Sequence, residues 1–341
     1  MFKTATLWKW LYSNWETSSD RPTPGYTILL PVPGDLPVFL KIALEICSNQ
    51  KPDNLVETIV IPDQSVPGFK ELLQEWTKDY SISPIRLVNP KPLEQFISAY
   101  KNHPHHNYAS QVIRGINATR STHALLHDAD LFITKDTFLN IHYEKCSNFH
   151  LSCLGVSPVW DSWYKEQGIC HLTATWELIF DVNWARSFKP WEHRGHDNEI
   201  DGKPHTFDVT LLPQCKTSPE LVQYHQEEWG FVHFNYVICT YRWFQKSKGS
   251  FEDDSFRILL IRSLINAFDK SDWKYDVPEL DELVRGITDK SNCVTYTQQR
   301  TRENYVEFRS KLQTLIDSQL LNEEKASILT DSVGDFDKVF G

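Results

Sequence analysis

The stretch Leu125-Leu126-His127-Asp128-Ala129-Asp130-Leu131-Phe132-Ile133 places two carboxylates in a run that otherwise has the composition of a buried strand. Burying two like charges is costly, because they repel each other and both lose hydration. A divalent cation removes both costs, and residues i and i+2 of an extended segment share a face, so Asp128 and Asp130 can converge on one ion. An ion held in this way can bridge phosphate oxygens, so the motif indicates chemistry on a nucleotide diphosphate. The alternative is a chance Asp-x-Asp that binds no metal, since the motif is short.

Composition narrows the class of protein. The 341 residues suffice for one large domain or two ordinary ones, and the net charge of -10 argues against a partner nucleic acid. Seven cysteines without a Cys-x-x-Cys pair predict reduced thiols in a cytoplasmic protein. The sequence contains no run of about twenty apolar residues, so no transmembrane helix is predicted. Trp8, Trp10 and Trp15 are expected to pack on the domain, with peripheral contact at the inner face of a membrane as the alternative.

Strand and helix patterns alternate through the first ~130 residues, which predicts βαβ units and a mostly parallel sheet. The predicted strands are Tyr26–Val32, Thr58–Ile61 and Ile85–Val88, and the predicted helices run over about 36–47, 68–76 and 108–119. Ligands of such sheets lie beyond the carboxyl ends of the strands. Four acidic residues lie at or just past predicted strand ends: Asp35, Asp63, Asp128 and Asp130.

The rest of the chain is less regular until it becomes helical near residue 255. Phe207–Pro213 is predicted as a short strand, and His103–His106 as a surface loop, because proline and asparagine neighbour the histidines. The C-terminal part shows two amphipathic faces. One face comprises Phe256, Leu259, Leu260 and Leu264, and the other comprises Tyr305, Phe308, Leu312 and Leu315.

Four motifs together resemble the GT-A glycosyltransferases, most closely the family 2 type, over about the first 135 residues. Ile28-Leu29-Leu30-Pro31-Val32 is similar to that family's opening strand, and Gly115-Ile116-Asn117-Ala118-Thr119-Arg120 to the segment before its metal motif. Val60-Ile61-Pro62-Asp63-Gln64-Ser65 resembles the family's Val-Val-Asp-Asp-Gly-Ser turn, with Pro62 and Gln64 as departures. Leu126-His127-Asp128-Ala129-Asp130 resembles its Leu-Asp-Ala-Asp motif.

This resemblance implies an α/β protein of the GT-A (nucleotide-diphospho-sugar transferase) fold, with a mostly parallel central sheet flanked by helices and a helical C-terminal extension. It implies four parts: an N-terminal extension (1–24), a nucleotide-sugar-binding half (25–135), an acceptor-binding half (136–248) and a helical C-terminal region (249–341). The implied activity is metal-dependent transfer of a hexosyl group, with inversion, from a nucleotide-diphosphate sugar donor to a hydroxyl acceptor such as a saccharide or a lipid-linked molecule.

The resemblance also implies roles for individual residues. The metal, Mn²⁺ or Mg²⁺, is expected on Asp130, Asp128 and His233. The nucleotide sugar is expected on Pro31, Asp63, Arg114 and Asp128. Two of these residues have a purely structural alternative. Asp63 can be a turn residue that bonds its own backbone, and His233 can be a hydrogen-bonded histidine of the core.

An inverting transferase needs a general base to take the proton of the acceptor hydroxyl. Gly195-His196-Asp197-Asn198-Glu199-Ile200 resembles the family's Gly-Glu-Asp-x-Asp segment, which lies at the start of a helix, with His196 replacing the usual glutamate. Asp197 is therefore expected to be the base, with Glu199 as the second catalytic candidate. Asp208 and Glu177 compete with them, and a solvated acidic loop is the alternative. Four tryptophans are candidates for stacking on the acceptor sugar: Trp160, Trp163, Trp176 and Trp191.

Two rival functions remain. A nucleotidyltransferase on a similar sheet is disfavoured, because Pro33-Gly34-Asp35 is acidic and poor in glycine where such enzymes have a glycine-rich basic loop. A catalytically degenerate GT-A-like protein that binds sugars or partner proteins is the second rival. The sequence leaves open the donor nucleotide, the sugar, the acceptor, the stereochemical outcome and the oligomeric state.

Overall fold

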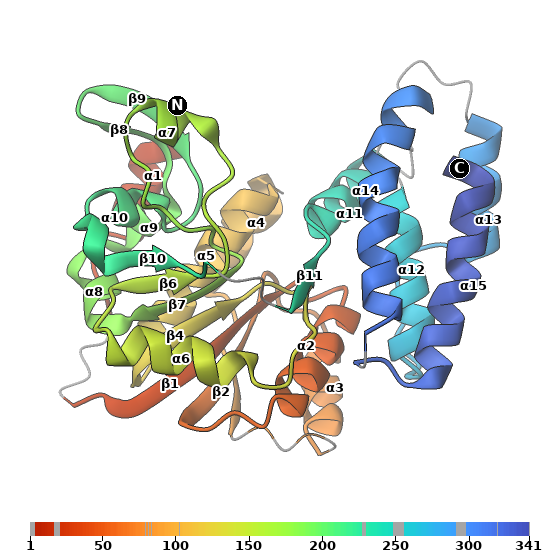
Figure 1. Cartoon of the computed structure of the whole chain (residues 1–341), viewed down its shortest axis with the longest axis horizontal. Coiled ribbons are helices and arrows are strands. Elements are labelled where there is room, and N and C mark those ends of the chain that lie inside the picture. The colour runs from red at the N-terminus through yellow and green to blue at the C-terminus, as the bar shows by residue number, and fades with distance from the viewer. Residues whose placement is uncertain are drawn as a thin grey trace. The chain divides into compact units, whose positions relative to one another are not determined.

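The computed structural model describes residues 4–16, 21–78, 80, 82, 84–101, 103–226, 230–247, 256–290, 298–318 and 320–340. The chain divides into two compact units (Figure 1). The first comprises residues 1–34, 47–129 and 135–229, and the second comprises 35–46, 130–134 and 230–341. Residues 230–247 thus group with the C-terminal helices, while the four-part functional division expected from the sequence stays a prediction.

The first unit is built on a seven-stranded sheet, which confirms the predicted α/β class with a mostly parallel sheet. Strand β7 (Glu177–Asp181) is antiparallel to its neighbours β4 (Ser121–His127) and β6 (Cys153–Gly155), and the other described neighbours in this sheet are parallel. Along the sheet the strands are β10 (Val222–Tyr224), β6 (Cys153–Gly155), β7 (Glu177–Asp181), β4 (Ser121–His127), β1 (Thr23–Val32), β2 (Leu55–Pro62) and β3 (Ile85–Leu87).

Helices cover both faces of this sheet (Figure 1). Leu29 packs in one buried cluster with Val112 and Ile116 of helix α5 (Pro104–Ala118). Tyr26 stacks on Tyr143 of helix α6 (Phe138–Asn148), with ring centroids 5.0 Å apart. Because residues 26 and 29 of a strand point to opposite faces, α5 and α6 lie on opposite sides of the sheet.

Helix α5 approaches the sheet closely at one glycine. A Cβ atom on Gly115 would lie 2.7 Å from Cδ1 of Ile61 and 3.0 Å from Cδ1 of Leu29. Any larger residue would push α5 away from strands β1 and β2, so the close packing requires glycine at this position.

The remaining elements of the first unit are short. A two-stranded antiparallel hairpin joins β8 (His196–Ile200) to β9 (Lys203–Phe207). The other helices are α1 (Thr4–Leu11), α3 (Phe69–Trp76), α4 (Pro92–Lys101), α7 (Ser162–Glu166), α8 (Val182–Ser187), α9 (Pro190–Arg194), α10 (Leu211–Cys215) and the 3₁₀ helix η1 (Pro219–Leu221). Helix α2 (Val38–Asn49) runs from the second unit into the first.

The second unit combines a small ribbon with helices. Strand β5 (Leu131–Ile133) pairs antiparallel with β11 (Phe231–His233). The helices are α11 (Val237–Lys246), α12 (Phe256–Phe268), α13 (Leu280–Lys290), α14 (Gln298–Ile316) and α15 (Glu323–Phe340). All eight residues of the two predicted amphipathic faces are buried, which confirms the helical C-terminal region.

A row of phenylalanine rings joins the ribbon to the helices of this unit. The ring of Phe234, which follows β11, lies 5.6 Å from that of Phe132 in β5 and 5.5 Å from that of Phe308 in α14. The Phe308 ring in turn lies 4.6 Å from that of Phe256 in α12. Such aromatic contacts add to the burial of apolar surface, so the C-terminal helices fix the position of β11.

Two local predictions were wrong. Phe207–Pro213 is not a strand: β9 ends at Phe207, Thr210 turns the chain with a φ of 67°, and α10 begins at Leu211. Pro213 lies in the first turn of this helix, where no intrahelical N–H donor is needed. His103–His106 is not a surface loop, because α5 begins at Pro104 and His106 is buried.

In the part of the chain that the structure describes, no helix has both the length and the apolar content needed to span a membrane. The six described cysteines are free thiols, and Cys293 lies outside the described residues.

Candidate active site

The two aspartates of the Asp-x-Asp motif lie in the turn between β4 and β5. Asp128 follows the last residue of β4, and its N–H donates to the carbonyl of Trp176 at 2.8 Å, which continues the pairing of β4 with β7. Asp130 immediately precedes β5 and is buried. A buried turn at the carboxyl end of a parallel strand is the place where this class of sheet binds ligands.

His233 is the last residue of β11, and the β5–β11 pairing sets its register opposite Leu131. Its Nε2 lies 3.2 Å from Oδ1 of Asp130. The N–H of Phe234 donates to the carbonyl of Asp130 at 3.2 Å, so backbone and side chain both hold the two residues together.

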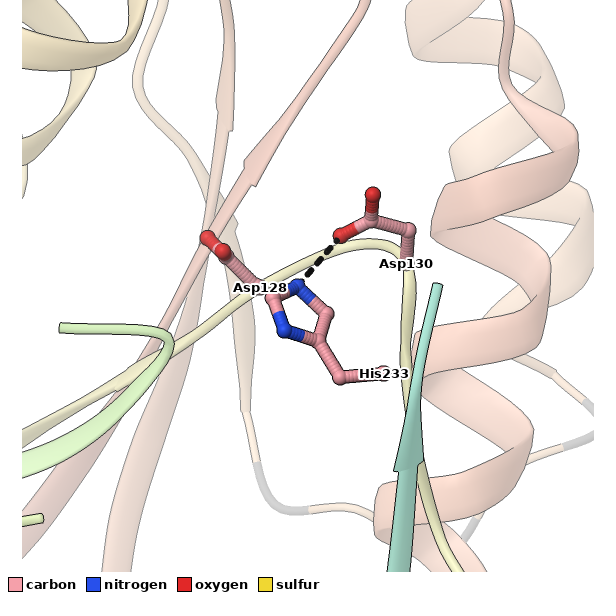
Figure 2. Close-up of side chains that lie close together, drawn as sticks. All are labelled: Asp128, Asp130 and His233. Carbon is pink, nitrogen blue, oxygen red and sulfur yellow. Dashed lines mark hydrogen bonds and ion pairs between the residues drawn. The ribbon is translucent and has the colours of Figure 1, made fainter. Parts of the chain in front are cut away.

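Asp128, Asp130 and His233 form a group with the donor set of a metal site. One carboxylate oxygen of each aspartate and one ring nitrogen of the histidine all lie within 4.8 Å of one another. Figure 2 shows the two aspartates on the turn, His233 reaching toward them from β11, and the contact between His233 and Asp130. Two carboxylates and a neutral imidazole suit Mn²⁺, and Mg²⁺ accepts the oxygen ligands, so the residues fit the predicted ion.

The surroundings of Asp130 favour its ionised form. Burial by itself would raise the pKa of this carboxyl group, but the neighbouring His233 and the N–H of Val237, 3.4 Å from Oδ2, hold the pKa below its usual range. Val237 is the first residue of α11, whose N-terminal dipole end also favours negative charge. An ionised carboxylate is the state in which aspartate binds a cation.

Asp63, which was expected to bind the nucleotide, follows the last residue of β2 and ties it to the end of β1. Oδ1 of Asp63 accepts the N–H of Gly34 at 2.9 Å, and the N–H of Asp63 donates to the carbonyl of Val32 at 3.0 Å. The alternative role of Asp63, as a turn residue, predicted that its side chain bonds its own backbone. The side chain instead accepts the backbone N–H of Gly34. Its contact with a nucleotide stays a prediction.

Arg114 and Pro31 are likewise buried in the framework. Nη2 of Arg114 donates to the carbonyl of Pro62 at 2.6 Å, and Nη1 lies 3.3 Å from Oε2 of Glu94. Pro31 is in register with Ile61 within the sheet. Both residues support the strand ends in this structure, and their roles in nucleotide binding stay predictions.

Asp35, the remaining acidic residue at a strand end, forms an ion pair in the second unit. Its two carboxylate oxygens accept hydrogen bonds from Arg242 at 2.6 and 2.7 Å. Burial opposes ionisation of Asp35, but Arg242 and Gln245 hold its pKa below the usual range. This bidentate pair joins the loop before α2 to α11.

The expected general base lies on a hairpin. The segment Gly195–Ile200, which was expected to start a helix, does not do so, because His196–Ile200 forms strand β8. Its backbone pairs antiparallel with β9 in place of the hydrogen bonds that a helix would have formed. Asp197 and Glu199 are exposed, and Thr206 donates a hydrogen bond to Asp197 at 3.0 Å. Their catalytic roles stay predictions.

The two competing acids lie elsewhere. Asp208 is half-buried, and its Oδ1 lies 3.5 Å from Nδ1 of His105. Glu177, the first residue of β7, is fully buried, and its Oε2 lies 2.7 Å from Nδ1 of His127. Glu177 is in register with His127, the residue before Asp128. It is therefore placed to support the β4 end rather than to reach an acceptor in solvent.

The candidate tryptophans fall into different environments. Trp163 stacks on His205 with ring centroids 3.9 Å apart, and Lys9 lies over the ring of Trp191. Trp160 and Trp176 stack on each other with centroids 5.5 Å apart and an interplanar angle of 19°. Trp160 is 48% exposed. The sequence could not separate this pair from the packed tryptophans, because the partners are 16 residues apart in an irregular segment.

No protein-family model matches the chain, and no curated protein matches it. Solved structures of glycosyltransferases do resemble it in fold. One is TarS residues 1–349 of S. aureus, at 10% identity, covering 93% of this chain and 90% of that chain with a TM-score of 0.39. Another is the mannosyltransferase PcManGT of Pyrobaculum calidifontis, solved with GDP-Man and Mn²⁺, at 11% identity, 98% and 94% coverage, and a TM-score of 0.35.

A third is glucosyl-3-phosphoglycerate synthase of Mycobacterium tuberculosis, solved with Mn²⁺, UDP and glucosyl-3-phosphoglycerate. It is 12% identical, covers 54% of this chain and 63% of that chain, and has a TM-score of 0.33. Identities and scores this low carry no conclusion about activity, which has to be argued from the residues of this chain.

Proposed function

We propose that this chain is a metal-dependent glycosyltransferase that moves a hexosyl group from a nucleotide-diphosphate sugar to a hydroxyl acceptor with inversion. The observation that carries the proposal is the group formed by Asp128, Asp130 and His233 at the carboxyl end of β4. The carboxylate of Asp128 adds a second negative charge close to the buried, ionised Asp130, which is costly without a cation, and cation binding accounts for that cost.

The different burial of the three side chains suggests a different role for each at this site. Asp130 and His233 are both buried and would hold the ion, while the half-buried Asp128 would contact the ion and the donor ribose. When bound, Mn²⁺ or Mg²⁺ stabilises negative charge on the departing nucleoside diphosphate. The His233 ring must present an unprotonated nitrogen to the ion, so it would bind as the neutral form.

Asp197 is the proposed general base. Its exposed carboxylate would accept the proton of the acceptor hydroxyl while that oxygen forms a bond to the anomeric carbon and the bond from that carbon to the diphosphate oxygen breaks. Thr206, which donates to Oδ1 of Asp197, would orient the carboxylate. Glu199 is on the same strand and is the second candidate.

A donor screen tests the proposal. Wild-type protein stripped with a chelator is incubated with UDP- and GDP-hexoses, and released nucleoside diphosphate is measured with and without Mn²⁺ or Mg²⁺. Asp130→Asn keeps the size of the side chain and removes its charge, and Asp331→Asn is the matched control, because Asp331 is exposed on α15 of the same unit.

The proposal expects metal-dependent release in the wild type and in Asp331→Asn, and its loss in Asp130→Asn. Metal-dependent nucleotide binding without turnover of any donor would overturn the enzymatic proposal in favour of a degenerate binding protein. Release that needs neither metal nor Asp130 would overturn the metal role.

A further inference from the structure

The stacked pair Trp160–Trp176 is built into the first unit beside the Asp-x-Asp turn. The carbonyl of Trp176 accepts the N–H of Asp128 at 2.8 Å, and the next residue, Glu177, begins β7 opposite His127. Because β7 is antiparallel to β4, its first residue lies at the carboxyl end of β4, where Asp128 also lies. The backbone of Trp176, one member of the pair, is therefore hydrogen-bonded to the backbone of Asp128 in the acidic turn.

The segment that carries Trp160 is held in place by hydrogen bonds. The N–H of Val159 donates to the carbonyl of Leu172 at 3.1 Å, and Pro158 forms a β-bridge with Thr173. On its other side, Asp161 caps α7 by accepting the N–H of Trp163 at 2.9 Å. Since both flanks are anchored, the Trp160 ring presents a fixed surface.

That surface is apolar, flat and open to solvent. The Trp160 ring rests on Trp176, yet 48% of the residue stays exposed. Burial of apolar surface is favourable, so a ligand that covers the exposed face of the Trp160 ring gains binding free energy. The two residues that follow Trp160, Asp161 and Ser162, are polar, while the exposed Pro158 and the half-buried Val159 precede it.

We propose that Trp160 is the stacking platform for a pyranose ring of the acceptor, and hence that the acceptor is a saccharide. This inference rests on the proposed function, which leaves the acceptor class open. A pyranose has one face of C–H groups and a rim of hydroxyls, which matches a flat ring with polar neighbours. An acyl chain requires a longer continuous apolar surface than one exposed ring, whereas a single pyranose is covered by a ring of this size.

Binding is tested first without donor or metal. The probes are the methyl pyranosides of glucose, galactose, mannose and N-acetylglucosamine, with maltose and cellobiose as disaccharides, each titrated into the millimolar range. In the wild type the readout is the indole N–H resonance of Trp160, assigned from its absence in Trp160→Phe. In the variants, saccharide affinity is measured by isothermal titration calorimetry, with the wild type measured in the same way. We expect at least one saccharide to shift this resonance, and Trp160→Ala to weaken its binding tenfold or more.

The control is Trp10→Ala, because Trp10 belongs to the same unit and is 67% exposed. It should bind the saccharide like the wild type. Trp160→Phe keeps an aromatic face and should retain part of the binding, which a purely structural role of Trp160 does not predict.

A second readout separates this proposal from the proposed function. Trp160→Ala should raise the KM for the saccharide acceptor tenfold or more, and by a larger factor than the KM for the donor. Trp10→Ala should leave both KM values and the rate of donor hydrolysis by water as in the wild type. An unmoved Trp160 resonance with every saccharide, or a resonance moved only by phosphatidylglycerol vesicles, overturns the saccharide platform even if donor hydrolysis is intact. Failure of donor hydrolysis with intact saccharide binding overturns the transferase and leaves the platform standing.

Discussion

Nε2 of His233 lies 3.2 Å from Oδ1 of Asp130, although the two residues are 103 positions apart in the chain. The pairing of β5 with β11 brings them together, and both are buried. A buried carboxylate beside an imidazole is either a structural hydrogen bond or part of a metal site. The nearby carboxylate of Asp128 favours the metal site, since a second negative charge is costly there without a cation.

Replacement of His233 by alanine should weaken metal binding and destabilise the protein together. Loss of the imidazole removes one donor, so we expect the affinity for Mn²⁺ to fall by at least ~10-fold. It also leaves Asp130 with fewer partners, at a cost of about 1–3 kcal/mol in the free energy of unfolding. Isothermal titration with Mn²⁺ and urea unfolding measure the two effects. His103→Ala, at an exposed histidine, should change neither, and an unchanged Mn²⁺ affinity in His233→Ala would remove His233 from the site.

Removal of the Phe308 ring should loosen the support of β11. Phe308 is buried between Phe234 and Phe256, so Phe308→Ala should cost about 3–5 kcal/mol of unfolding free energy. Val306, two residues earlier on α14, is 70% exposed, and Val306→Ala should change stability by less than ~0.5 kcal/mol. Denaturant unfolding compares the two variants. Equal effects would contradict the packing role of Phe308.

Two glycine substitutions should change stability in opposite directions. Gly115→Ala forces a Cβ atom to within 2.7 Å of Ile61, so overpacking should cost about 1–3 kcal/mol. Gly334 lies within α15 with no atom within 4 Å of an added Cβ, so Gly334→Ala should stabilise the protein by about 0.5–1 kcal/mol. Thermal unfolding of the two variants measures whether each substitution lowers or raises the stability. A stable Gly115→Ala would mean that α5 does not pack as closely on β1 and β2 as the structure indicates.

Stability should fall in mild acid because of a buried histidine. Burial lowers the pKa of His193 from 6.5 to about 4, while Nε2 stays bonded to the carbonyl of Ala185 at 2.7 Å. Between these two pKa values the unfolded chain binds a proton that the folded protein does not, so stability is full above pH 6.5 and is lost as the pH falls toward 4. The loss from this one group is roughly 3 kcal/mol.

Unfolding free energies measured from pH 7.5 to 4.5 test this prediction. In His193→Gln the amide can still donate to Ala185 but does not titrate, so the slope of stability against pH should be shallower than in the wild type. An identical slope in both proteins would assign the acid sensitivity to other groups.

The sequence predicted those parts of the fold that depend on local patterns. Short continuous apolar runs predicted β1 and β2, because both faces of these strands are buried. The 3.6-residue period predicted the buried faces of α12 and α14, because residues at this spacing share one face of a helix. The apolar run before Asp128 and Asp130 predicted their position just past a strand end, but the segment that carries them is a turn between β4 and β5 and not an extended segment. His233 could be proposed because a polar residue interrupts the apolar run Phe231–Phe234.

Other features had no local signal. The hairpin β8–β9 consists mostly of polar residues, so the segment around Asp197 shows no apolar alternation and was expected to start a helix. The Asp35–Arg242 ion pair joins residues 207 positions apart. Neither Arg242 nor Phe308 carries a sequence mark that links it to its partner, since tertiary packing alone creates those contacts.

The most direct test of the account is Mn²⁺ binding followed by the electron paramagnetic resonance of the free ion. Wild-type protein, Asp130→Asn and Asp331→Asn are titrated with Mn²⁺ in the presence of UDP or GDP. The account predicts one nucleotide-dependent Mn²⁺ site in the wild type and in Asp331→Asn, and no such site in Asp130→Asn with an unchanged circular dichroism spectrum. Equal Mn²⁺ binding by Asp130→Asn and the wild type would contradict the claim that the acidic turn after β4 holds the metal.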